Sequence, residues 1–330
     1  MAGAASPQDV IDESWTRALR RYRAALALLA VFMLLAAGGT SVAQQETRDA
    51  ASGSDHSSPV DSIATPPAPE ARINGWKLAA VSAAAASTLG ASYLYLKETW
   101  WKDGTTTFHF DDGPDLRYAR NLDKAAHFYG GLIGADLFYG ALKWTGMSKT
   151  ASLYTGAAFG TFVQFAIEFK DGFSPRWGWS WQDVGWGTVG SWYPLARHYW
   201  PFLKNIDFKW SYWRRSDRYF QVKKTGTWND DYVNQTYWMS LKVNNLLPES
   251  VEPYWPDFLA VALGVGIDDD YDGMGGGNIE IYLSLDYDLP RILPSSSPLW
   301  EAVKHYLNYI HFPAPAVRLT PTAIWYGFYF

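Results

Sequence analysis

The feature that most constrains this chain is a series of long segments with few charges, in its middle third. The clearest runs from Leu78 to Leu96 and holds no charged residue. Segments of similar character follow at about 122–144 and 151–169, and a shorter one rich in Gly and Trp spans about 181–196. A stretch of about 20 apolar residues is long enough to cross a bilayer as a helix. A helix buried inside a soluble domain is the alternative for each segment.

Small residues recur in these segments at the spacing of one helix face. Gly130 and Gly134 lie four residues apart, and Gly156 and Gly160 begin a second series that continues to Gln164 and then to Glu168. Residues four apart share one face of a helix, so each series predicts a stripe where a neighbouring helix can approach closely.

Aromatic residues add to the membrane-like character of the chain. They make up 17% of its 330 residues, with 18 Trp and 21 Tyr. Tyr93 and Tyr95 lie at the end of the first segment, and Trp100 and Trp101 follow it, as in the aromatic belts of membrane interfaces. We therefore expect the lipid bilayer as a partner.

The amino-terminal residues resemble an export signal. A basic stretch precedes an uncharged apolar run from Ala24 to about Ala37, and Ser41-Val42-Ala43 has the small-x-small form of a cleavage site. We predict a signal peptide over 1–43, with an uncleaved anchor as the alternative, and a disordered tether over 44–72. The tether is rich in Ser, Ala and Pro, and so lacks the apolar side chains that would repay ordering.

The carboxyl-terminal third changes from a helical to a strand period. We predict strands at about 207–213, 235–243, 258–267, 279–289 and 316–330, and one helix at about 299–309. Five strands are too few for a closed membrane barrel. The predicted fold is therefore α+β: a bundle of apolar, membrane-type helices over about 76–198, followed by a small antiparallel sheet or an incomplete barrel-like element over about 205–330. The domains would be 73–200, helical, and 201–330, β-rich and packed on the helices.

Composition excludes several classes of function. The net charge of -5 argues against a nucleic-acid partner, because phosphate neutralisation needs a basic surface. The absence of cysteine excludes disulfides, cysteine zinc sites and thiol nucleophiles. No phosphate-binding loop, nucleophilic triad motif or zinc-helix motif occurs. We therefore predict no cofactor.

Polar residues gather at the ends of the predicted helices. In an antiparallel helix pair, the start of one helix lies beside the end of the next, so these groups are expected to meet. Ionisable groups in apolar helices usually face a protein interior or a wet cavity. The candidate catalytic residues are Asp123, His127, Glu168, Asp171 and Asp183, and the candidate ligand-binding residues are Lys124, Gln164, Arg176 and Ser180.

Two interpretations of this cluster stay open at the level of sequence. As a site, it would run acid–base chemistry or hold a divalent metal through His127, Glu168 and Asp171. As a structural network, it would only satisfy buried groups, and Ser180 with Asp183 matches a helix capping box.

Several separated blocks resemble the YfiM-like family of predicted periplasmic lipoproteins, whose domain has no assigned function. The blocks are Phe108–Asp112, Leu122–His127, Ile167–Ser174, Trp177–Ser180 with Asp183, Asp231–Tyr232, Gln235–Ser240 and Tyr282–Leu289. The order of the Asp-Lys-x-x-His, Glu-x-x-Asp-Gly and Ser-x-x-Asp motifs is also distantly similar to VanZ-type membrane proteins. One departure is that this chain has no cysteine to carry a lipid.

Together these features predict an exported protein of the bacterial cell envelope, associated with the inner or the outer membrane. The first hypothesis is a structural or interaction role. The alternative is a membrane-embedded hydrolase or lipid-modifying enzyme that uses the carboxylate–histidine cluster, and it requires the cluster to converge at an accessible cleft.

Overall fold

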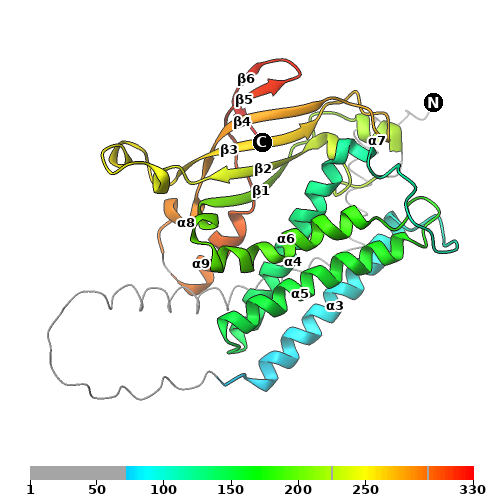
Figure 1. The fold of residues 1–330 in the computed structure, drawn as a ribbon, viewed down its shortest axis with the longest axis horizontal. Helices are drawn as coiled ribbons and strands as arrows, with labels where there is room; N and C mark the ends of the chain where they lie inside the picture. Colours follow the sequence, from blue (N-terminus) through cyan, green and yellow to red (C-terminus); the bar gives the residue numbers. More distant parts are fainter. Residues whose placement is uncertain (1–71, 224–225, 296) are drawn as a thin grey trace, which may run out of the picture.

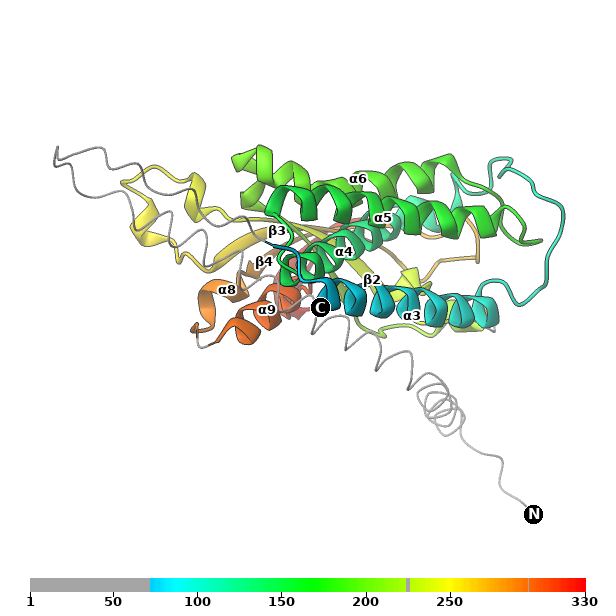
Figure 2. The same ribbon diagram turned by 90° about the horizontal axis from the view of Figure 1, so that it is seen from below.

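The computed structural model describes residues 72–330 apart from 224–225 and 296 (Figure 1). The predicted signal peptide lies outside the described residues, as does the tether up to residue 71. The described chain forms a layer of long helices with a single twisted sheet beside it (Figures 1 and 2).

Four long helices form the helical layer. They are α3 (Gly75–Thr99), α4 (Leu122–Trp144), α5 (Lys149–Asp171) and α6 (Trp181–Tyr199). Side-chain caps define three of the starts: Asn74, Ser148 and Ser180 each accept a hydrogen bond from a backbone N–H of the first turn. A short 3-10 turn, η1 (Tyr118–Asn121), leads directly into α4.

Glycines let α4, α5 and α6 pack with their backbones close together. A Cβ at Gly131 of α4 would lie 2.1 Å from the carbonyl oxygen of Gly187 on α6. One at Gly156 of α5 would lie 2.6 Å from the Ala135 oxygen on α4. The predicted stripe at Gly156 and Gly160 is therefore a real contact. At Gly134 the prediction is wrong, because no atom lies within 4 Å of a Cβ there, whereas a Cβ at Gly130 would lie 3.4 Å from the side chain of Gln164 on α5. The close backbone contact of α4 lies at Gly131.

The predicted bundle of apolar, membrane-type helices is wrong. Within the described residues only α3 is long and apolar enough to span a membrane, and just 11% of its most apolar window is buried. The other helices bury many charged side chains, and α4 alone buries Asp123, Lys124, Asp136 and Lys143. Charged side chains are costly in lipid, whereas here ion pairs from other parts of the chain compensate them. Asp136, for example, lies 2.6 Å from the ring of His305 on α9 (Pro298–Leu307).

The sheet has six antiparallel strands in chain order. They are β1 (Ile206–Tyr212), β2 (Gln235–Leu241), β3 (Leu259–Ile267), β4 (Ile279–Tyr287), β5 (Ala314–Thr320) and β6 (Ile324–Tyr329). The segment predicted as one strand over 316–330 is thus a hairpin of two. The short helices α7 (Arg218–Lys223) and α8 (Leu289–Ile292) lie in the connections.

The two faces of the sheet differ in an unusual way. One row of cross-strand partners is apolar across all six strands, and its members include exposed side chains; it runs Phe208, Met239, Leu263, Leu283, Val317, Trp325. The opposite face is buried, and it combines an aromatic cluster around Trp238 and Tyr282 with charged side chains. On it Lys209 lies 2.7 Å from Asp286, and Glu280 pairs with both Arg215 and Arg318. We call the first row the apolar sheet row.

The helical layer covers part of this apolar face. The ring of Phe128 on α4 lies 4.6 Å from that of Phe208, which begins the apolar sheet row. Tyr129, the next residue, donates a hydrogen bond of 2.6 Å to the carbonyl oxygen of Tyr309 beyond α9. These contacts fix the start of α4 against the sheet, and the polar cluster lies at this same end of α4.

Candidate functional site

The start of α4, the end of α5 and the start of α6 meet at one cavity of about 120 Å³. Asp123, His127, Glu168, Asp171 and Asp183 all line it. The antiparallel helix arrangement thus brings these five predicted side chains to one place, although the helices are not of membrane type.

A loop before α4 completes the wall of the cavity. Residues 106–111 run beside residues 172–179, through hydrogen bonds from His109 N to Gly172 O at 2.8 Å and from Asp111 N to Trp179 O at 2.9 Å. The side chain of Asp111 then accepts hydrogen bonds from the N–H groups of Gly113 and Asp115. This turn places Asp115 at the cavity.

Lys124 is the centre of a buried ion network. Its Nζ lies 2.6 Å from Asp115, 2.9 Å from Asp123 and 2.7 Å from Asp183, and only 7% of its side chain is exposed. Burial opposes a charged lysine, but the charges of Asp123 and Asp183 hold its pKa above the ordinary value. Lys124 therefore remains an ammonium ion that neutralises part of the cluster.

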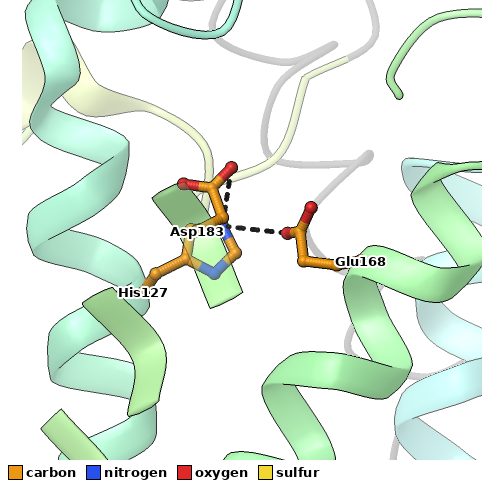
Figure 3. A group of neighbouring side chains, drawn as sticks. All are labelled: His127, Glu168 and Asp183. Carbon is orange, nitrogen blue, oxygen red and sulfur yellow. Dashed lines mark ion pairs between the residues drawn. The ribbon is translucent and has the colours of Figure 1, made fainter. Parts of the chain in front are cut away.

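His127 occupies a second position in the same cluster (Figure 3). Its Nδ1 lies 2.9 Å from Gln164 Oε1. Because an amide oxygen only accepts hydrogen bonds, Nδ1 carries a proton, and in the neutral imidazole Nε2 then presents a lone pair. Nε2 lies 3.6 Å from Glu168 Oε1 and 3.7 Å from Asp183 Oδ2. Side chains from α4, α5 and α6 thus point toward one another around this lone pair.

Ser180 links the structural and the chemical interpretations. Its hydroxyl accepts the N–H of Asp183 at 3.2 Å, so Ser180 caps α6 as the capping-box motif predicts. The same hydroxyl donates to Asp115 at 2.6 Å, and the Ser180 N–H donates to Glu168 Oε2 at 3.1 Å. The cap therefore also orients two carboxylates of the cluster.

Asp171 lines the cavity but lies outside the group formed by His127. Its Oδ1 accepts a hydrogen bond of 2.6 Å from the indole of Trp101. The residues that can hold a metal ion are instead His127, Glu168 and Asp183, whose ligand atoms all lie within 4.8 Å of one another. Asp183 thus takes the position that was predicted for Asp171. A second such group, formed by Asp115, Asp123 and Asp183, already holds the Lys124 ammonium.

Burial and mutual repulsion raise the pKa of three carboxyl groups in the cavity. The pKa of Asp123 rises to about 8, that of Glu168 to about 10 and that of Asp171 to about 7. Burial is the largest cause for each. Asp115 is the exception: despite its burial, hydrogen bonds from Lys124 and Ser180 hold its pKa below the ordinary value. The cavity thus contains proton donors and acceptors side by side near neutral pH.

The remaining wall of the cavity carries two cations. Arg176 and Lys223 both line it, together with the acidic side chains of Asp111 and Asp230. The pKa of Lys223 falls to about 8 because of burial and the nearby Arg176 charge. Arg176 lies over the ring of Trp177, at 4.7 Å from the ring centre, and forms no ion pair with the described residues. An anionic group entering the cavity would meet these cations.

Sequence reasoning missed three residues of this site. Asp115 follows the Asp-Asp-Gly-Pro turn, whose acidic run was the available signal. Trp101 and Lys223 carried no signal, because each comes from a segment far away in the sequence: Trp101 donates a hydrogen bond to Asp171, and Lys223 lines the cavity.

Comparison of the chain with protein-family models, with curated proteins and with solved structures finds no match. The function must therefore be argued from the cavity itself.

Proposed function

We propose that the protein is a hydrolase of the cell envelope, attached to the lipid bilayer, that activates a water molecule among His127, Glu168 and Asp183. The observation that carries this proposal is the position of His127 Nε2, which lies 3.6 Å from a carboxyl oxygen of Glu168 and 3.7 Å from one of Asp183 in a small cavity. A water molecule among these atoms would meet polar groups contributed by three different helices.

The cavity also supplies a proton donor. Asp123 has a pKa of about 8, so it holds its proton at neutral pH. In the proposed reaction the water oxygen bonds to the electrophilic atom of the substrate and gives up a proton to an acceptor of the cluster. The bond to the leaving-group oxygen breaks, and that oxygen takes the proton of Asp123. Carboxyl groups with separated pKa values serve such paired acid and base roles.

The cations of the cavity favour an anionic substrate. Arg176 and Lys223 lie on its wall, with Asp123 and Glu168 among the acidic groups that share the space. Guanidinium and ammonium groups bind phosphoryl oxygens well. We therefore propose a phosphate ester as the substrate class.

Two features support association with a bilayer. Helix α3 meets the length and composition of a membrane span and buries little of its surface in the protein. The apolar sheet row exposes large side chains, among them Trp325 at 67%. Exposed apolar surfaces of this kind often mark membrane or protein contacts. In this proposal the protein is anchored at the membrane, and its site lies in the folded part beside it.

Hydrolysis of bis(p-nitrophenyl) phosphate by the full-length protein in detergent micelles tests the proposal. We expect His127→Ala to lose about a hundredfold or more of the rate, as is typical when a proton acceptor is removed. His198→Ala, at the other end of α6, is the matched control and should keep the rate. No hydrolysis by the unaltered protein, or equal rates for the two variants, would overturn the proposal and favour a structural or interaction role.

A further inference from the structure

Three acceptor atoms in the cavity have the spacing of ligands to one ion. They are Nε2 of His127, Oε1 of Glu168 and Oδ2 of Asp183, and the two distances from Nε2 are 3.6 and 3.7 Å. Atoms that share a tetrahedral ion at about 2.1 Å lie about 3.4 Å apart. Only a small inward movement would complete such a site, and the cavity leaves room on one side.

The imidazole of His127 is already oriented as a ligand. Its Nδ1–H donates to Gln164 Oε1 at 2.9 Å, which leaves Nε2 unprotonated and aimed at the two carboxylates. Metal-binding histidines almost always donate their second ring N–H in this way, because it fixes both the tautomer and the ring direction.

An independent observation is that a deeply buried carboxyl oxygen at this cavity has no hydrogen bond. Asp123 is 3% exposed and lines the cavity, and its Oδ1 is without a hydrogen-bond partner in the described part of the chain. Glu168 is 2% exposed, and its Oε2 accepts the N–H of Ser180. Buried oxygens normally find a donor or a cation.

We propose that His127, Glu168 and Asp183 bind a divalent transition-metal ion of the Zn²⁺ class. One imidazole and two carboxylates are ligands that such ions accept, and an open fourth position is typical of catalytic sites. The neighbouring group of Asp115, Asp123 and Asp183 is not a second metal site, because Lys124 lies within 2.9 Å of each of its members. The inference deepens the proposed function, since an ion here would carry the reacting water.

Equilibrium binding of Zn²⁺ alone tests the inference without any substrate. Full-length protein in detergent micelles is stripped with a chelator, dialysed and titrated with Zn²⁺ in a calorimeter. We expect one ion per chain, and a loss of affinity of at least about tenfold in His127→Ala, Glu168→Gln and Asp183→Asn. Glu168→Gln keeps an acceptor for the Ser180 N–H, so it tests the ligand in a variant that retains this contact.

His198→Ala provides the comparison, because His198 lies at the other end of α6 and does not line the cavity. It should keep the affinity of the unaltered protein. The inference would be overturned if the unaltered protein bound no Zn²⁺, or if all three ligand variants bound Zn²⁺ as tightly as the unaltered protein. Hydrolysis that depends on His127 but persists in chelator would contradict the metal site and support the proposed function. Zn²⁺ binding without hydrolysis would support the metal site and contradict the proposed function.

Discussion

Among single substitutions in the cluster, Lys124→Met is expected to lower the free energy of unfolding the most. Its ammonium group lies 2.6 to 2.9 Å from three carboxylates and is nearly inaccessible to water. At an effective dielectric constant of about 20, an ionised pair at this distance attracts by roughly 6 kcal/mol. The desolvation of the buried ions offsets most of this attraction, and removal of one buried partner typically costs about 3–5 kcal/mol. We expect a loss of that size for Lys124→Met near neutral pH.

The loss should depend on pH in a defined direction. Asp115 has a lowered pKa in the folded protein, so its contribution to stability is present above about 3.8 and is lost as the pH falls through its folded pKa. Without Lys124 this contribution disappears, and protonation then reduces the repulsion among the remaining carboxylates. The difference between Lys124→Met and the unaltered protein should therefore shrink as the pH falls, by about 1.4 kcal/mol per pH unit for each extra proton bound.

Urea unfolding followed by tryptophan fluorescence, in detergent micelles and across a range of pH, measures this difference. Lys102→Met is the control, because Lys102 is exposed. A loss below about 1 kcal/mol, or one that does not vary with pH, would refute the idea that a single buried cation holds the carboxylates together.

Two further predictions concern packing and burial elsewhere. Gly131→Ala should lower the free energy of unfolding by more than about 2 kcal/mol, because its Cβ would lie 2.1 Å from the Gly187 oxygen. Gly134→Ala has open space, and it should be neutral or stabilise the protein by up to about 1 kcal/mol. The urea midpoints of the two variants test this difference. Burial raises the pKa of Asp231 to about 6, so its contribution to stability is full below about 3.8 and is lost as the pH rises through 6. Between pH 4 and pH 7, the stability of Asp231→Asn should accordingly rise by up to about 3 kcal/mol relative to that of the unaltered protein. A stability difference between the two proteins that is the same at both pH values, measured by thermal unfolding, would contradict this.

The positions of the long helices were predictable because their signals are local. The uncharged run at 78–96 lies within α3, and the start of α6 follows directly from the Ser180 cap. That these helices are not of the membrane type could not be predicted from the sequence. The charges that α4 buries find partners such as His305, 169 residues away, which a sequence pattern does not reveal.

The other differences between the predicted and the observed structure are errors of one or a few residues in position. A four-residue spacing of glycines predicts a stripe but not its face, so the contact lies at Gly131 rather than at Gly134. The final hairpin was read as one strand because the alternation of apolar residues continues on both sides of a short turn at 321–323. In the cluster, the sequence predicted Asp171 as the third metal ligand, but Asp171 accepts a hydrogen bond from Trp101, and Asp183 lies nearer to His127.

Anomalous X-ray scattering from crystals of the full-length protein grown with Zn²⁺ tests the central claim most directly. We predict a single strong peak bonded to His127 Nε2, Glu168 and Asp183, at about 2.0–2.2 Å from each ligand atom, with Lys124 still seated among its three aspartates. Clear density for these side chains with no peak between them, or with His127 turned away from both carboxylates, would contradict the account.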